Sequence, residues 1–189
     1  KDICKNKKIL LIGDEIQGGI ERTSKIFAYK HYGVLPDIIT SAKGLGSGIP
    51  IGATIVKKNI AENIDIGFHG STFGGGMLQT RVAYNVFKTI NKTSFLNNVK
   101  SKGILLEKLL NKLNSKHDLI KEVRIKGLMA GIEFKNSKLA VKIYKETSNH
   151  GLVTTLVKGT TIRITPPLII KSEEIKRGIR IISDCLNKI

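Results

Sequence analysis

The sequence has no tryptophan, only two cysteines and no long apolar segment. Cys4 and Cys185 lie near opposite ends of the 189 residues, without CxxC spacing or a histidine cluster, so we expect neither a metal site nor a disulfide scaffold. No apolar run approaches the roughly 20 residues that a bilayer crossing requires, which excludes a membrane-spanning helix. No signal-type segment follows Lys1, so a cytoplasmic protein is expected.

Acidic residues are scarce relative to basic ones. The chain has 15 Asp and Glu against 32 Lys and Arg, and the resulting net charge of +17 would attract any polyanion. However, the lysines are scattered along the whole chain, aromatic residues make up only 5%, and no nucleic-acid-reading motif is present. We therefore interpret the charge as compositional bias on a solvated surface, and do not expect nucleic acid as the main partner.

The first half of the chain has the pattern of a parallel sheet. Short apolar runs predict strands at residues 8–13, 38–40 and 52–56. The first run has the continuous apolar character of a strand buried on both faces, and residues 25–32 are helix-like, as in a strand, crossover, strand unit. Ligands bind such sheets at the carboxyl ends of strands, which is where Asp14 and Lys43 fall.

The second half predicts helices and strands in a different order. Apolar residues recur at helical spacing from about residue 94, followed by patterns typical of strands and a hairpin. The predicted elements are strands within 122–134, a helix at 137–149, a hairpin of 153–157 with 161–165, and a last helix from 172. We therefore expect two domains, residues 1–93 and 94–189.

An acid and a lysine at the ends of neighbouring strands suggest a specific chemistry. Lys43 lies among Ala42, Gly44 and Gly46, so its amine has room to approach a planar ligand and form a Schiff base. An aspartate at the position of Asp14 would hold a protonated ring nitrogen, as for pyridoxal phosphate. Taken alone, each residue has a plainer interpretation, since Asp14 could cap a helix and Lys43 could be a surface lysine.

Four ordered blocks resemble the signature of the class III (omega) aminotransferases, and most closely its acetylornithine and ornithine branch. The blocks are Asp14-Glu15-Ile16-Gln17, Arg22-Thr23-Ser24-Lys25, residues 36–46 around Ser41-Ala42-Lys43-Gly44, and His69-Gly70-Ser71-Thr72-Phe73-Gly74-Gly75. The resemblance continues through residues 127–133 and 162–168. It implies an α/β protein of pyridoxal-phosphate transferase fold type I: the C-terminal part of the large, mixed-sheet domain, followed by a small α+β C-terminal domain.

The resemblance also implies roles for individual residues. Lys43 would bind the cofactor covalently and move the reacting proton, Asp14 would keep the pyridine nitrogen protonated, and Gln17 would contact the ring hydroxyl. Ser71 and Thr72 would reach the cofactor phosphate of a neighbouring subunit, which implies a homodimer with shared active sites.

The implied reaction moves the terminal amino group of N-acetylornithine to 2-oxoglutarate, with Arg163 binding the carboxylate of 2-oxoglutarate or glutamate. One alternative is the related aminotransferase of lysine biosynthesis, whose substrate is linked to an acidic carrier protein. Another is a non-catalytic remnant that acts as a binding partner. No metal is expected.

The sequence also departs from the family pattern. Glu21 and Ile125 each stand where a glycine is usual, and Gly75-Gly76-Met77-Leu78 replaces the common Gly-Asn-Pro-Leu. Losing a glycine where a positive φ is needed costs on the order of 1 kcal/mol or more. The upstream half of the family pattern, with its phosphate-binding turn, is not found, so we expect a fragment or split subunit that binds cofactor weakly by itself.

Overall fold

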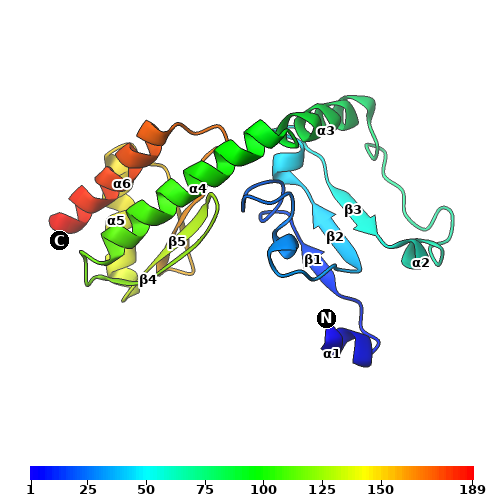
Figure 1. Cartoon of the computed structure of the whole chain (residues 1–189), viewed down its shortest axis with the longest axis horizontal. Coiled ribbons are helices and arrows are strands. Elements are labelled where there is room, and N and C mark those ends of the chain that lie inside the picture. The colour runs from blue at the N-terminus through cyan, green and yellow to red at the C-terminus, as the bar shows by residue number, and fades with distance from the viewer. The chain divides into compact units, whose positions relative to one another are not determined.

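The computed structural model describes all 189 residues, which form two compact units, residues 1–96 and 97–189 (Figure 1). Each unit contains its own β-sheet. Unit 1 comprises α1 (Asp2–Asn6), β1 (Ile12–Asp14), η1 (Ala28–His31), β2 (Ile38–Ser41), η2 (Lys43–Leu45), β3 (Ala53–Val56), α2 (Lys58–Ala61) and α3 (Met77–Ile90). Unit 2 comprises most of α4 (Thr93–Asn114), then β4 (Ile120–Lys126), β5 (Met129–Phe134), α5 (Ser137–Asn149), β6 (Thr155–Val157), β7 (Thr161–Ile164) and α6 (Ser172–Asn187).

The sheet of unit 1 is mixed and has the strand order β1-β2-β3. β1 and β2 are parallel, with Asp14 in register with Thr40, and β3 runs antiparallel to β2. All three predicted strands form. The helix-like stretch predicted at residues 25–32 is only the single 3₁₀ turn η1.

The prediction that residues 8–13 form a strand buried on both faces is wrong. The strand begins at Ile12, and the side chains of Ile9, Leu10 and Ile12 are 58%, 53% and 59% exposed. β1 is an edge strand that pairs on one side only, with β2. Within these 189 residues, its apolar side chains therefore remain largely open to solvent.

Two carboxylates hold the loops of unit 1 in place. The Glu15 side chain is buried and accepts hydrogen bonds from the backbone N–H groups of Ala28 and Tyr29, both at 2.8 Å. Asp37 accepts from the backbone N–H of Leu11 at 2.9 Å and pairs with Lys57 at 2.5 Å. The Leu11 N–H and then the Lys57 ammonium lower the pKa of Asp37, since both favour its charged form.

Unit 2 is an antiparallel sheet of order β4-β5-β7-β6 with a helical layer on one face. Along β5 the side chains alternate, with Ala130, Ile132 and Phe134 buried. The buried helical side chains of this unit include Val99, Leu106, Leu110, Leu113, Ile143, Ile175 and Ile182. Burying each Leu or Ile side chain contributes roughly 1.5–3 kcal/mol, so this apolar layer stabilises the unit.

The elements predicted for this half form as expected. The predicted hairpin is β6 paired with β7, and α5 follows the predicted bounds, with Gly151 beyond it at φ +78°. The last helix begins at Ser172, and the Glu174 carboxylate accepts a hydrogen bond from the Lys171 backbone N–H at 2.7 Å. None of the helices is both long enough and apolar enough to cross a membrane.

Candidate active site

The structure brings Asp14 and Lys43 to the same edge of the unit 1 sheet. Asp14 is the last residue of β1, and Lys43 follows the end of β2 by two residues. Because β1 and β2 are parallel neighbours, their carboxyl ends lie side by side. The sheet therefore presents a carboxylate and an amine at adjacent strand ends.

The carboxylate of Asp14 is oriented by hydrogen bonds. Its Oδ1 accepts from the backbone N–H of Ile16 at 3.1 Å and from the Thr40 hydroxyl at 3.4 Å. The residue is exposed and forms no ion pair. Asp14 can therefore accept a further hydrogen bond from a cationic N–H group outside this chain.

The backbone at Lys43 is in the left-handed region, at φ +46°, and its side chain is exposed. Such a conformation in a residue other than glycine is uncommon and is often found at functional sites. A Cβ at Gly46 would lie 2.0 Å from the Ile49 carbonyl oxygen, so the tight turn requires glycine there. At Gly44 the only neighbour of such an atom would be the Ile20 nitrogen, at 3.9 Å, which leaves open space beside Lys43.

Three other residues assigned by resemblance also lie in unit 1. Gln17 is exposed in the turn that follows β1. Ser71 and Thr72 are exposed on the segment between α2 and α3, where the Gly74 N–H donates to the Ser71 carbonyl at 3.0 Å. This segment runs apart from the carboxyl ends of β1 and β2 (Figure 1), so the structure does not bring Ser71 and Thr72 to Asp14 and Lys43.

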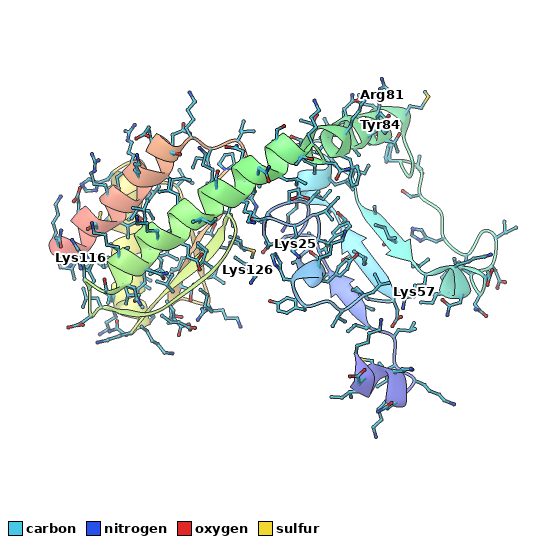
Figure 2. All side chains as sticks on the ribbon, viewed as in Figure 1. Lys25, Lys57, Arg81, Tyr84, Lys116 and Lys126 are labelled. Atoms are coloured by element: carbon cyan, nitrogen blue, oxygen red, sulfur yellow. The ribbon has the colours of Figure 1, made fainter.

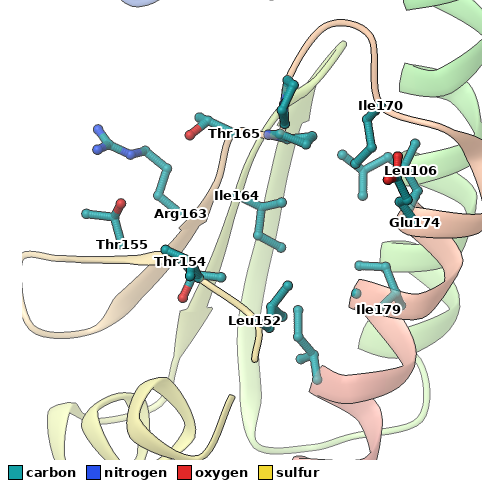
Figure 3. A pocket seen from close by; sticks show the side chains of 16 residues that line it. Leu106, Leu152, Thr154, Thr155, Arg163, Ile164, Thr165, Ile170, Glu174 and Ile179 are labelled. Carbon is teal, nitrogen blue, oxygen red and sulfur yellow. The ribbon is translucent and has the colours of Figure 1, made fainter. Parts of the chain in front are cut away.

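Arg163 lies in unit 2, on β7, in register with Thr155 of β6 and Gly131 of β5. Figure 3 shows its side chain directed away from the helices that carry Leu106 and Ile179. A pocket of about 310 Å³ lies between the sheet and these helices. Its lining is mainly apolar, with residues such as Leu152, Ile164 and Ile175, and Arg163 is also among the residues that line it. The sequence did not predict this pocket, because it depends on how the helices pack against the sheet.

Glu21 and Ile125, the two replacements of a usual glycine, differ in their backbone. Glu21 has φ +61°, the left-handed conformation that favours glycine, whereas Ile125 lies inside β4 without a positive φ. The Glu21 side chain is 1% exposed, and its Oε2 has no hydrogen-bond partner. Burial raises the pKa of Glu21 to about 7, with a smaller opposing effect from Lys30. No group of three or more His, Cys, Asp or Glu side chains is placed to hold a metal ion.

The family comparison matches almost the whole chain. A model of the class-III aminotransferases covers residues 1–186. The chain belongs to this family. An acetylornithine aminotransferase from Caldanaerobacter subterraneus is 42% identical over 189 residues, and an acetylornithine/succinyldiaminopimelate aminotransferase from Photorhabdus laumondii is 39% identical over 191. These alignments cover 100% of the chain but only 48% and 47% of the two relatives, so it spans about half the length of the class-III enzymes it matches.

Solved structures of class-III enzymes share the fold. The acetylornithine aminotransferase of Elizabethkingia anophelis superposes with a TM-score of 0.90 at 34% identity, covering 100% of the chain and 48% of that structure. The ornithine aminotransferase of Plasmodium yoelii gives a TM-score of 0.91 at 33% identity, covering 99% and 50%. The predicted α/β transferase fold is therefore confirmed.

Proposed function

We propose that the protein is a pyridoxal-phosphate-dependent aminotransferase that moves the terminal amino group of N-acetylornithine to 2-oxoglutarate. The observation that carries the proposal is the placement of the Asp14 carboxylate and the Lys43 amine at the ends of adjacent parallel strands. Membership of the class-III family and the names of the relatives support the reaction and its donor.

The residues at this edge fit the cofactor. A planar pyridinium ring needs an anionic acceptor for its N–H, and Asp14 offers an exposed carboxylate without an ion pair. The aldehyde needs an accessible amine, and Lys43 is exposed beside the open space at Gly44. Pyridoxal phosphate, when bound, supplies an electron sink that accepts the electron pair left on the substrate carbon.

The chain's own residues then have distinct tasks. The Lys43 Nζ would hold the cofactor covalently at rest, and after release it would move a proton between the substrate carbon and the cofactor carbon in each half of the reaction. The Asp14 carboxylate, fixed by Ile16 and Thr40, holds the proton of the ring nitrogen and stabilises its positive charge. Gln17 would contact the hydroxyl group of the cofactor ring and so orient the ring.

Substrate binding is assigned to Arg163. A guanidinium offers two parallel N–H donors to a carboxylate, which suits 2-oxoglutarate and glutamate. The assignment follows from its position in the family motif, and the side chain lies on the sheet face opposite the helices (Figure 3).

A homodimer with shared active sites is part of the proposal. In the family motif, Ser71 and Thr72 contact the phosphate held by a second subunit, and in this chain both lie on an exposed segment, as that role requires. Large apolar side chains around them are strongly exposed, among them Phe68 at 80%, Phe73 at 80% and Met77 at 90%. Exposed apolar surface of this kind marks an association site.

The proposal is tested by measuring amino transfer from N-acetylornithine to 2-oxoglutarate with the complete natural protein that contains these residues. Lys43→Ala should lower kcat by about 100-fold or more, because it removes the general base. Lys58→Ala is the matched control, since Lys58 is an exposed lysine of the same unit that pairs only with Glu62, at 3.7 Å. Full activity in Lys43→Ala would contradict the proposal, and an inactive parent protein would favour the non-catalytic alternative.

A further inference from the structure

Three residues form a row across the outer face of the unit 2 sheet, the face opposite the helices. Arg163 of β7 is in register with Gly131 of β5, which is in register with Arg124 of β4. Directly opposed residues of antiparallel strands point to the same side of a sheet. Ala130 and Ile132, which flank Gly131 in β5, are buried on the other side, so Gly131 separates two arginines on the outer face.

The fold itself does not require glycine at position 131. Its φ lies outside the left-handed region, and a Cβ would meet only the Thr161 Cγ2, at 3.2 Å. That methyl group ends a partly exposed side chain and can shift by the few tenths of an ångström needed. Glycine inside a strand costs roughly 0.5–1 kcal/mol relative to alanine, and it often marks a place where a ligand or another backbone approaches closely.

The acidic side chains on this face bind basic side chains of β4, which lies on the other side of β5 from Arg163. Glu133 accepts from Lys121 and from the Arg124 Nη1, both at 2.7 Å, and Glu122 accepts from the same nitrogen. These bonds lower the pKa of Glu133, with Lys121 the larger cause and Arg124 the smaller. The Arg124 guanidinium is thereby held toward Glu122 and Glu133. Gly131 and Arg163 are both partly exposed.

We infer that Gly131 forms the floor of the substrate carboxylate subsite. Its missing side chain leaves room beside Arg163 for the carboxylate of a small oxo or amino acid, with 2-oxoglutarate as the probe. The inference rests on the proposed function, in which Arg163 binds that carboxylate. Gly131 is thus a specificity-determining residue, because a side chain there would occupy the ligand's space without disturbing the sheet.

The test compares Gly131→Ala and Gly131→Val in the complete natural protein. The KM for 2-oxoglutarate should rise progressively with side-chain size, by about tenfold or more for valine, while the melting temperature stays unchanged or rises. The increase in melting temperature that 2-oxoglutarate itself produces should shrink in the same order, which gives a binding readout independent of turnover.

Thr161→Ala supplies the control, because it removes the one atom that a Cβ at position 131 would contact. Alone it should leave the KM unchanged, and combined with Gly131→Val it should preserve the raised KM. An unchanged KM in Gly131→Val would overturn the inference. A loss of stability, with equal effects on both substrates, would also overturn it and would show that another part of the protein occupies the space.

The variant Arg163→Ala separates a failure of the Gly131 inference from a failure of the role assigned to Arg163. If Arg163→Ala raises the KM for 2-oxoglutarate and Gly131→Val does not, the subsite inference alone fails. If Arg163→Ala leaves the KM unchanged, the assignment of Arg163 within the proposed function fails.

Discussion

At the scale of single residues, the Asp14 carboxylate is positioned by neutral donors rather than by an opposite charge. Its Oδ1 accepts from the Ile16 N–H and the Thr40 hydroxyl, and no cationic side chain pairs with it. An asparagine could keep both hydrogen bonds, because its amide oxygen is also an acceptor. The geometry and the charge of this position can therefore be separated by one substitution.

Asp14→Asn should retain most of the bound cofactor but lower kcat by about 100-fold or more. The reason is that the negative charge of Asp14 stabilises the protonated ring nitrogen during the reaction. Occupancy is measured by cofactor absorbance, and turnover by the rate of amino transfer. Equal losses of occupancy and turnover would show that Asp14 is structural.

Glu21 has a left-handed backbone conformation, at φ +61°, and a buried carboxyl group, and both are unfavourable. Because its pKa rises from 4.5 in the unfolded chain to about 7 in the fold, ionisation costs more in the folded protein than in the unfolded one. The free energy of unfolding should therefore fall as pH rises from 4.5 through about 7. Glu21→Gln removes this fall and keeps the strained φ of +61°.

Glu21→Gly should remove both penalties. At pH 8 its free energy of unfolding should exceed that of the parent, by roughly 1 kcal/mol or more from relief of the backbone strain, plus the burial cost. Urea unfolding of the parent and both variants at pH 5 and pH 8 measures the two effects. A parent protein with the same stability at both pH values would contradict the account.

At the scale of elements, prediction from sequence succeeded where one face of an element is buried within the chain. The alternation along β5 and the leucine spacing of α4 are visible in the sequence, and both elements form. Prediction failed at residues 8–11, since an apolar run shows that a segment can be buried but not what would cover it. The segment at 25–32 has helix-forming residues, yet the Glu15 carboxylate caps only a short 3₁₀ turn there.

Two helical glycines in unit 2 should respond oppositely to alanine. A Cβ at Gly103 of α4 would lie 2.9 Å from the Gly127 Cα, where the β4–β5 turn packs against the helix. Gly103→Ala should therefore lower the free energy of unfolding by roughly 1–3 kcal/mol.

A Cβ at Gly178 of α6 would make an ordinary 3.4 Å contact with Leu152, so Gly178→Ala should raise the free energy of unfolding by roughly 0.5–1 kcal/mol. Denaturant unfolding measures both, and stabilisation by Gly103→Ala would show that α4 is not packed as described.

At the scale of the whole molecule, the candidate site was only partly predictable. The placement of Asp14 and Lys43 at one edge of the sheet was predictable from the residues, because parallel strands place their carboxyl ends together. Their roles were assigned through the family resemblance. Arg163 was assigned only through the family resemblance. Its place in one row with Gly131 and Arg124 depends on cross-strand register, which the spacing of residues along the chain does not reveal.

The net charge of +17 has a consequence for partners. Exposed basic side chains such as Lys25, Lys116 and Lys126 occur in both units (Figure 2). If the substrate were linked to an acidic carrier, kcat/KM should fall steeply as salt rises, because attraction over more than about 8–10 Å is screened. Free N-acetylornithine should show a flatter profile. Measuring kcat/KM for both substrates across a salt series distinguishes the two alternatives. Flat profiles, with N-acetylornithine the preferred substrate, would remove the carrier alternative.

The most direct test of the central claim is to locate the covalently held cofactor. The complete natural protein is incubated with pyridoxal phosphate, reduced with borohydride, digested and analysed by mass spectrometry. We expect loss of the visible absorbance and a phosphopyridoxyl group on Lys43, with neither change in Lys43→Ala. A modification fixed at another lysine, or a cofactor absorbance that survives in Lys43→Ala, would contradict it.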